Sequence, residues 1–181
     1  MSQLGLDPSK LVFVDETWAK TNMTRLRGRS GVGERLVAKI PHGHWKTTTL
    51  IAALGHRKMR CAMTIDGAVN RDAFEVFVEQ ILLPTLSCGD IVVMDNLSSH
   101  KGTGVKRLIE SVGAKVLYLP PYSPDLNPIE MAFAKLKQLM RSAAHRTMVA
   151  LWSDVQRMLD CITDSDAKGF YRHCGYSLEV K

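Results

Sequence analysis

Three runs of apolar residues divide the chain, and each has the length of a buried β-strand. They are LVFVDET (11–17), DIVVMDN (90–96) and AKVLYLP (114–120). Short apolar runs of this kind are typical of strands that are covered on both faces. Because acids break the first run, we expect its strand to end at Asp15, and prolines should cut off the third.

Two further segments, TTTLIAALG (47–55) and RCAMTIDG (60–67), are rich in residues that favour strands. They are expected to pair as a β-hairpin that turns at HRKM. A shorter strand is also expected at RLVAKI (35–40).

Helical periodicity separates these strands. Apolar residues at i, i+3, i+4, i+7 and i+8 predict an amphipathic helix capped by Asn70; they are Phe74, Phe77, Val78, Ile81 and Leu82. A second helix should stop at Gly113, and others should cover 128–145 and 149–162. This order predicts one α/β domain over 1–181, with a mixed five-stranded sheet flanked by helices.

Composition narrows the class of protein. The 181 residues suffice for one domain with a substantial core. We expect neither a membrane-spanning helix nor a secretory signal, because no long apolar run or charged leader is visible. The four cysteines are scattered without a CxxC pair. They favour a reducing cytosol over a disulfide framework or a zinc site.

Charge is concentrated in one segment. The net charge is +6, and residues 20–46 hold seven basic residues against one acid, Glu34. A solvated charged loop is one interpretation. Trp18 and Trp45 lie near the ends of the segment, which favours a surface that faces phosphates.

Three acids have the spacing of a metal site. Asp15 and Asp95 close two apolar strands, and ligand sites in open α/β sheets gather at the carboxyl ends of strands. Glu130 opens a helix after the stiff loop PPYSPDLNPIE (120–130). Converging carboxylates need a cation between them, and oxygen ligands favour Mg²⁺ or Mn²⁺. A pair of such ions supports phosphodiester chemistry.

Each acid also has a structural interpretation. Either aspartate could be a turn former at the end of a strand. Glu130 has the position of a capping-box glutamate, with Asn127 as N-cap and Pro128 at the first helical position. Against capping, Lys137 and Arg141 fall within about 20° of Glu130 around the helix axis. One acid followed by two cations suits a helix that lies along a nucleic-acid backbone.

Four segments together resemble a known family: LVFVDETWAKTNMTRLRG, PHGHWKTTTLIAAL, DIVVMDNLSSHKG and LPPYSPDLNPIEMAFAKLK. They are similar to the DDE transposase catalytic domain of the mariner-like bacterial insertion-sequence superfamily, which has an RNase H-like fold. The resemblance spans about residue 10 to residue 176. It implies that Asp15, Asp95 and Glu130 are catalytic and hold two Mg²⁺ or Mn²⁺ ions.

The implied activity is metal-dependent cleavage at transposon ends. A 3′-OH then attacks target DNA, usually at a TA dinucleotide. Implied partners are double-stranded DNA and a second copy of the chain, as a homodimer on DNA, and the implied location is the cytoplasm and nucleoid of a bacterium. Relatives carry N-terminal helix-turn-helix modules, which we expect to be absent here. The chain would then be a truncated copy, an excised domain or one frame of a split gene.

Other residues are expected to support the site. Asn96, His100 and Asn127 could orient a metal ligand or hold a water. DNA contacts are expected from basic residues on the charged segment and the late helix, namely Arg25, Arg27, Arg29, Lys46, Lys137 and Arg141. Tyr122 could contact DNA or pack on the prolines of its own loop. His42 and His44 lack a third ligand nearby, which argues against zinc.

Two alternatives to a DNA-cleaving enzyme stay open. The first is a non-catalytic DNA-binding remnant of a transposase, which the basic segment alone would explain. The second is a hydrolase of small molecules that uses aspartates at strand ends. The sequence after LVFV reads DET rather than the DxD pair of one such class, so this second alternative has less support.

Overall fold

The computed structural model describes residues 6–42, 44–95 and 103–176. A five-stranded sheet forms its centre, in the spatial order β3-β2-β1-β4-β5. The strands are β1 (Leu11–Lys20), β2 (Thr47–Gly55), β3 (Met59–Asp66), β4 (Ile91–Met94) and β5 (Lys115–Tyr118). β1 pairs antiparallel with β2 and parallel with β4, so the sheet is mixed, as the sequence predicts. The expected hairpin is confirmed by the antiparallel pairing of β2 with β3.

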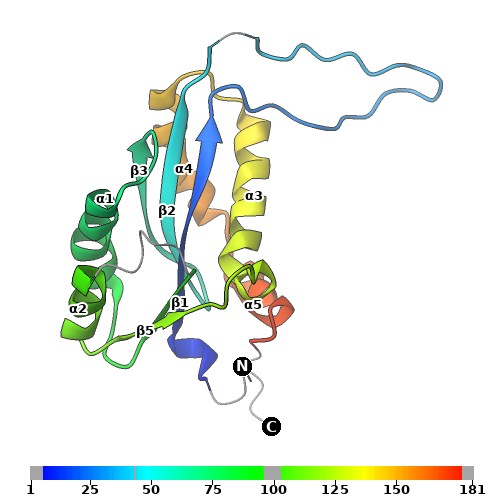
Figure 1. Cartoon of the computed structure of the whole chain (residues 1–181). Coiled ribbons are helices and arrows are strands. Elements are labelled where there is room, and N and C mark those ends of the chain that lie inside the picture. Colours follow the sequence, from blue (N-terminus) through cyan, green and yellow to red (C-terminus); the bar gives the residue numbers. More distant parts are fainter. Residues whose placement is uncertain (1–5, 43, 96–102, 177–181) are drawn as a thin grey trace.

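Helices cover both faces of this sheet (Figure 1). One face carries α3 (Pro128–Ala143), α4 (Met148–Asp160) and α5 (Asp164–His173), and the other carries α1 (Arg71–Val76) and α2 (Thr103–Ser111). Successive side chains of β1 point to opposite faces of the sheet, so β1 contributes to both hydrophobic cores. Phe13 is buried in the core under α3, and Val14 is buried in the core under α1. This burial on both faces explains why the run reads as continuously apolar.

Short helical turns complete the connections. They are η1 (Pro8–Lys10), η2 (Phe77–Leu82, with π-type bonding that continues α1), η3 (Leu83–Thr85) and η4 (Pro124–Leu126). The expected cap of α1 is confirmed, because the Asn70 side chain accepts from the backbone N–H of Ala73 at 2.8 Å. Gly113 follows α2 with a φ of 77°, which suits a glycine stop.

The strand β1 is longer than its apolar run predicts. It continues to Lys20 because β2 pairs with it along its length, from Val12–Gly55 to Lys20–Thr47. The parallel pairing with β4 ends earlier, at Val14–Met94. The expected strand end at Asp15 is therefore wrong. Asp15 lies inside β1, one residue beyond the point where its parallel neighbour stops.

Two other strand predictions need correction. Residues 35–40 form no strand. They belong to a long excursion between β1 and β2, described over 21–42 and 44–46, which we call the arm. Leu36, Val37 and Ile40 are exposed there, because no partner strand covers them. β5 is a strand, but at the edge of the sheet it is only half-buried. Figure 1 shows the arm projecting from the body of the molecule.

The tail of the chain, which has no clear pattern in the sequence, folds as α5. Thr163 and Asp166 form a capping box at its start. Its buried Tyr171 hydroxyl donates to the backbone oxygens of Leu11 at 2.8 Å and Leu54 at 3.1 Å. The tail thereby ties the first residue of β1 to the end of β2. None of the helices in the described part of the chain is long and apolar enough to cross a membrane.

Candidate active site

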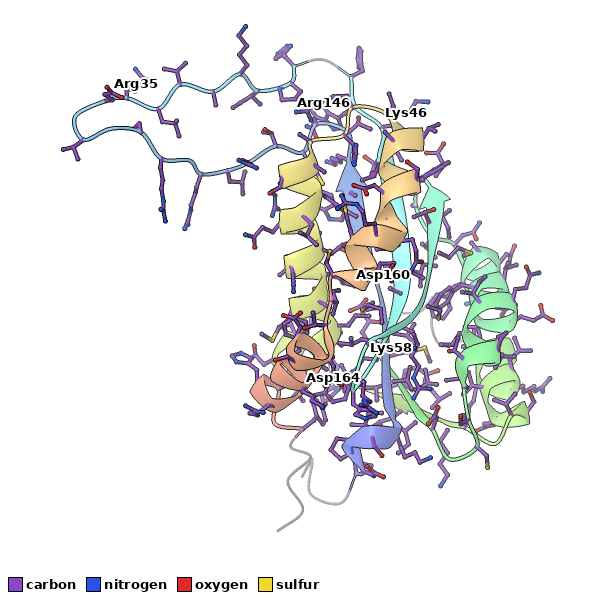
Figure 2. The ribbon with its side chains drawn as sticks, turned by 180° about the vertical axis from the view of Figure 1, so that it is seen from behind. Arg35, Lys46, Lys58, Arg146, Asp160 and Asp164 are labelled. Atoms are coloured by element: carbon purple, nitrogen blue, oxygen red, sulfur yellow. The ribbon has the colours of Figure 1, made fainter. Side chains whose placement is uncertain are left out.

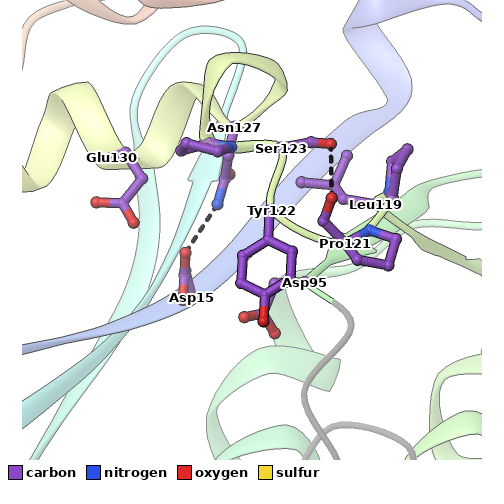
Figure 3. A pocket seen from close by; sticks show the side chains of 10 residues that line it. Asp15, Asp95, Leu119, Pro121, Tyr122, Ser123, Asn127 and Glu130 are labelled. Carbon is purple, nitrogen blue, oxygen red and sulfur yellow. Dashed lines mark hydrogen bonds between the residues drawn. The ribbon is translucent and has the colours of Figure 1, made fainter.

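Three carboxylates from distant parts of the sequence line one cavity of about 370 Å³ (Figure 3). Asp15 comes from β1, Asp95 follows β4, and Glu130 comes from the first turn of α3. The loop between β5 and α3 forms another wall, with an apolar lining that includes Leu119 and Pro121. The sequence thus predicts correctly that these three acids come together.

Asp15 is the most buried of the three, with only 7% of its surface exposed. Residue alternation along β1 puts it on the same face as Phe13, toward α3. Both of its carboxylate oxygens accept hydrogen bonds: Oδ1 from the backbone N–H of Glu16 and Oδ2 from the Asn127 side-chain amide, each at 2.7 Å. These two donors fix the direction of the carboxylate.

Burial raises the pKa of the Asp15 carboxyl to about 7. The hydrogen bond from Glu16 acts in the opposite direction, and the nearby carboxylates of Glu130 and Asp95 raise the pKa further. A buried carboxyl among other acids therefore holds its proton close to neutral pH. A bound cation would favour the ionised form instead.

Asn127 and Glu130 do not form the capping box that the tetrapeptide NPIE suggests. Asn127 occupies the N-cap position of α3, but its side chain makes no capping hydrogen bond. Its amide reaches Asp15 instead, and its backbone N–H donates to the Pro124 oxygen at 2.9 Å. The side chain of Glu130 is exposed on the cavity side (Figure 3).

The set of donors suits a hard divalent cation, since it consists of carboxylate oxygens. As the side chains stand, no three His, Cys, Asp or Glu residues in the described ranges are placed to hold an ion together. Glu130, which is exposed, can change rotamer without disturbing the core. Asp15 is held from both sides, so it would provide the fixed ligand of such a site.

A row of cations continues from the cavity along α3. Lys137 and Arg141 are half-buried on the helix, two and three turns beyond Glu130. The Lys137 ammonium lies 4.8 Å from the centre of the Trp18 ring, and that of Lys20 lies 4.9 Å from it. Desolvation lowers the pKa of Lys137. Trp18 itself is 51% exposed, so an aromatic ring that contacts two cations is accessible from solvent.

This position of Trp18 is not apparent from the sequence pattern. Trp18 is even-numbered on β1, like Val12 and Val14, and therefore belongs to the face that α1 and α2 cover further down. β4 stops beside Val14, so no neighbouring strand continues the sheet on that side of Trp18. One signal could have identified Trp18. It has the same alternation as the buried residues Val12 and Val14, but it lies beyond the point where β4 ends.

The arm presents its basic residues to solvent. Arg25, Arg27, Arg29 and Lys46 are all exposed. At the base, the backbone N–H of Thr21 donates to the Lys46 oxygen at 3.2 Å. Arg146, which follows α3, donates to the oxygens of Thr21 at 3.2 Å and Met23 at 2.8 Å. Figure 2 shows Arg146 and Lys46 at the base of the arm and Arg35 near its tip.

The other residues that the sequence analysis names as possible site residues lie in three different places. Asn96 and His100 lie outside the described residues. His42 and His44 are exposed and line a small cavity with Trp45 and Arg146 at the base of the arm. Tyr122 lines the carboxylate cavity and is wholly exposed, so it does not pack on the prolines of its loop.

Comparison with solved structures places the fold. The chain is similar to the Mos1 transposase in its paired-end complex with left transposon end, with a TM-score of 0.75 and 18% identity over 92% of this chain and 52% of that one. For the Mos1 mariner paired-end complex with Mn the TM-score is 0.76, at 18% identity, 93% of this chain and 54% of that one. For the catalytic domain of Mos1 mariner transposase it is 0.66, at 16% identity, 93% and 79%.

The fold is therefore RNase H-like, and the chain spans about half the length of the Mos1 chains in the paired-end complexes. No curated protein matches the sequence. The sequence model of the family described as DDE superfamily endonuclease matches residues 10–151, which is well over half of the chain. The carboxylate cavity lies between elements of that segment, and the chain belongs to the DDE superfamily endonuclease family.

Proposed function

We propose that this chain is the catalytic part of a DNA transposase, in which Asp15, Asp95 and Glu130 hold divalent ions that promote phosphodiester cleavage and strand transfer. The observation that carries the proposal is the meeting of these three acids in one cavity, on elements of an RNase H-like fold. Membership of the DDE superfamily endonuclease family supports it. Related Mos1 structures were solved with Mg and Mn.

Each group of residues that lines the cavity has a distinct role in this proposal. Bound Mg²⁺ or Mn²⁺ would supply an activated oxygen nucleophile and charge stabilisation for the leaving oxygen. Asp15 is the ligand with a fixed direction, because Glu16 and Asn127 hold its two oxygens. Glu130, an exposed side chain in the first turn of α3, completes the set from the α3 side of the cavity. The loop between β5 and α3 lines one side of the cavity, largely with apolar side chains.

Double-stranded DNA is the proposed substrate. The row of Trp18, Lys137 and Arg141 leads away from the cavity along α3, and the exposed arginines of the arm extend the basic surface outward. Contacts of this kind bind phosphates and give little sequence selectivity. We also propose that two copies of the chain act together on paired transposon ends. The similarity in fold to Mos1 transposase in a paired-end complex with left transposon end supports this proposal.

Nicking of supercoiled plasmid tests the proposal. Wild type should nick in Mn²⁺ or Mg²⁺ and not in EDTA, and the Asp95→Asn and Glu130→Gln variants should lose at least about a hundredfold of the rate. Glu79→Gln is the matched control, since Glu79 is an exposed acid that does not line the cavity. Undiminished nicking by Asp95→Asn would refute the assigned chemistry.

A non-catalytic DNA-binding remnant is the second candidate. Its support is that the carboxylates, as they stand in the described residues, are not placed to hold an ion together, while the basic residues of the arm are exposed. This candidate predicts strong binding that falls steeply with salt and is the same in EDTA and Mn²⁺. Metal-dependent nicking in the same preparation would exclude it.

A further inference from the structure

The turn of the β2–β3 hairpin forms a second cavity, which we call the hairpin cavity, with a volume of about 430 Å³. Volumes of about 300–1,000 Å³ are usual for small-molecule sites. All four basic residues of the segment 55–60 line this cavity, and the segment that leads from η3 into β4 forms the other wall with Thr85 and Ser87. The four basic residues are His56, Arg57, Lys58 and Arg60.

Arg60 is held in a fixed position in the hairpin cavity. Only 19% of its side chain is exposed, and its Nη1 donates to Asp90 Oδ2 at 2.6 Å and to the Thr85 oxygen at 3.0 Å. Gly55 makes room for it, because a Cβ at that position would lie 2.9 Å from the Arg60 Nε. Since no buried side-chain nitrogen or oxygen in the described residues lacks a partner, the other N–H groups of this guanidinium are satisfied or reach solvent. A guanidinium fixed in this way is ready to bond an anion.

Positive charge is in excess around the hairpin cavity. Arg57 donates to Asp164 Oδ1 at 3.1 Å, but Asp164 also accepts from Lys168 at 2.6 Å. Lys58 forms no ion pair with any residue that the structure describes. Together with the pair that Asp90 forms, two acids therefore face four cations. An excess of positive charge in a concave site attracts an anion.

The hairpin cavity and the carboxylate cavity lie at opposite ends of β4. Asp90 precedes this strand and Asp95 follows it, so the two residues are about 16 Å apart at the rise of a β-strand. Figure 2 shows Lys58 and Asp164 in the half of the body away from the arm. Because α3 leads from the carboxylate cavity toward the arm, a duplex that follows this helix leaves the hairpin cavity open to another ligand.

We propose that the hairpin cavity is a second anion site, which binds a phosphate group at the end of the sheet opposite the three acids. A phosphate suits the donors, because a fixed guanidinium, an ammonium and a hydroxyl group can each bond one of its oxygens. The phosphate comes either from a free phosphate compound or from the backbone of a DNA segment other than the one at the acids. Neither source requires a metal or cleavage, so this inference does not depend on the proposed function.

Calorimetry with inorganic pyrophosphate tests the site in the full chain, in EDTA so that no metal bridges the probe to the acids. Wild type should bind, and Arg57→Gln combined with Lys58→Gln should raise Kd at least about tenfold. Both side chains are exposed, so the fold should be kept. Arg60 stays in place because its loss would leave the buried Asp90 without its partner.

Arg71→Gln combined with Arg107→Gln is the matched control. Both arginines are exposed, neither lines the hairpin cavity, and the change in net charge is the same. Their Kd for pyrophosphate should stay within about twofold of wild type, because salt screens charges at a distance. Equal losses in the two double variants would show that net charge alone attracts the probe, and would overturn the site.

His56 gives a local readout, because it lines the hairpin cavity. Burial lowers the pKa of His56, and the charges of Arg57 and Arg60 lower it further. Asp164 acts in the opposite direction. A bound phosphate would oppose the two arginines, so pyrophosphate should raise this pKa in an NMR titration. His56→Gln identifies the signal, and the signal of His145, on the connection between α3 and α4, should not move.

A short DNA duplex, also in EDTA, separates the two sources of phosphate. A shift of the His56 signal with the duplex that is lost when Arg57 and Lys58 are both glutamine assigns the phosphate to a DNA backbone. A shift with pyrophosphate alone assigns it to a free phosphate compound. Absence of a shift with either probe would overturn the proposal.

Discussion

The carboxylate cavity and the arm lie at opposite ends of α3, and they are built in opposite ways. At the N-terminal end of the helix, Asp15 is buried in a central strand and receives hydrogen bonds on both oxygens. At the C-terminal end, Arg146 joins the body to an arm whose arginines are all exposed. The arm has neither helix nor strand in its described residues.

The roles proposed for the two regions account for this difference. A metal ligand that is displaced by about an ångström loses much of its effect on a reaction, so it belongs on a strand in the middle of a sheet. Contacts to phosphates act through charge over a longer range and tolerate variation in geometry. In its proposed role the arm needs reach and charge rather than a packed core. The two regions should respond differently to substitution.

Among substitutions that leave the three acids in place, the largest effect should come from loosening the cavity. Asn127→Ala deletes the amide that holds the Asp15 Oδ2, so we expect metal-dependent nicking to fall about 10- to 100-fold. Binding of DNA in EDTA should be unchanged. Because an N–H donated to a carboxylate favours its charged form, the pH midpoint of nicking should also move upward.

Asn70→Ala is the control for Asn127→Ala, since it removes the cap of α1 at a similar cost in stability, on the other face of the sheet. It should leave nicking unaltered well below Tm. Equal losses in the two variants would mean that Asn127 acts through stability alone.

A smaller and different effect is expected from the arm. Replacing Arg25, Arg27 and Arg29 with glutamine removes three exposed charges. If all three meet phosphates, the slope of log K against log salt should decrease by about 2.7, and binding near 0.1 M salt should weaken about tenfold or more. Nicking at saturating DNA should stay close to wild type. A fall in the saturated rate with an unchanged salt slope would place the arm in the chemistry instead.

The two regions should also differ in their dependence on pH. With its pKa raised to about 7, Asp15 keeps a proton in the folded chain that the unfolded chain releases near pH 4. The metal-free protein should therefore lose stability as pH rises from about 4 to 7 and lose no more above 7. Binding of Mn²⁺ displaces this proton, so affinity should rise up to about tenfold per pH unit below 7 and then level off.

Titration of Mn²⁺ by calorimetry at several pH values, beside Tm measurements in EDTA, tests both trends. Affinity that does not change between about pH 5 and 7 would show that Asp15 is ionised without a metal. The arm substitutions should alter neither curve, which separates the two regions again.

Sequence pattern predicts much of the fold because local rules and tertiary structure agree there. The hairpin of β2 and β3 and the cap at Asn70 are set by neighbouring residues. The three acids meet because each stands just after a buried run or at the start of a helix. Where pairing with a segment distant in sequence determines the structure, the local sequence pattern gives the wrong prediction. Pairing with β2 carries β1 past Asp15 to Lys20, although acids interrupt its apolar run.

Two other errors have the same origin. The apolar residues of 35–40 suggest a strand, but no neighbouring strand in the described residues offers them a partner, and Leu36 and Val37 stay exposed. Asn127 has the local chemistry of a helix cap, yet the buried carboxylate of Asp15, 112 positions away in sequence, takes its amide. Neither outcome can be read from the residues nearby, because both depend on how the sheet is assembled.

The junction at the base of the arm has a consequence for how this protein can change. The last register pair of β1 and β2 is Lys20–Thr47, and the Thr21 N–H to Lys46 oxygen bond closes the arm just beyond it. The two ends of the excursion are thus fixed beside each other, whatever lies between them. Doubling the number of residues in such a loop costs only about 0.6 kcal/mol in closure entropy. Insertions and deletions are therefore inexpensive here, whereas one extra residue within β1 would turn Asp15 away from α3. The arm is the place where a foreign recognition peptide could be inserted without disturbing the carboxylate cavity.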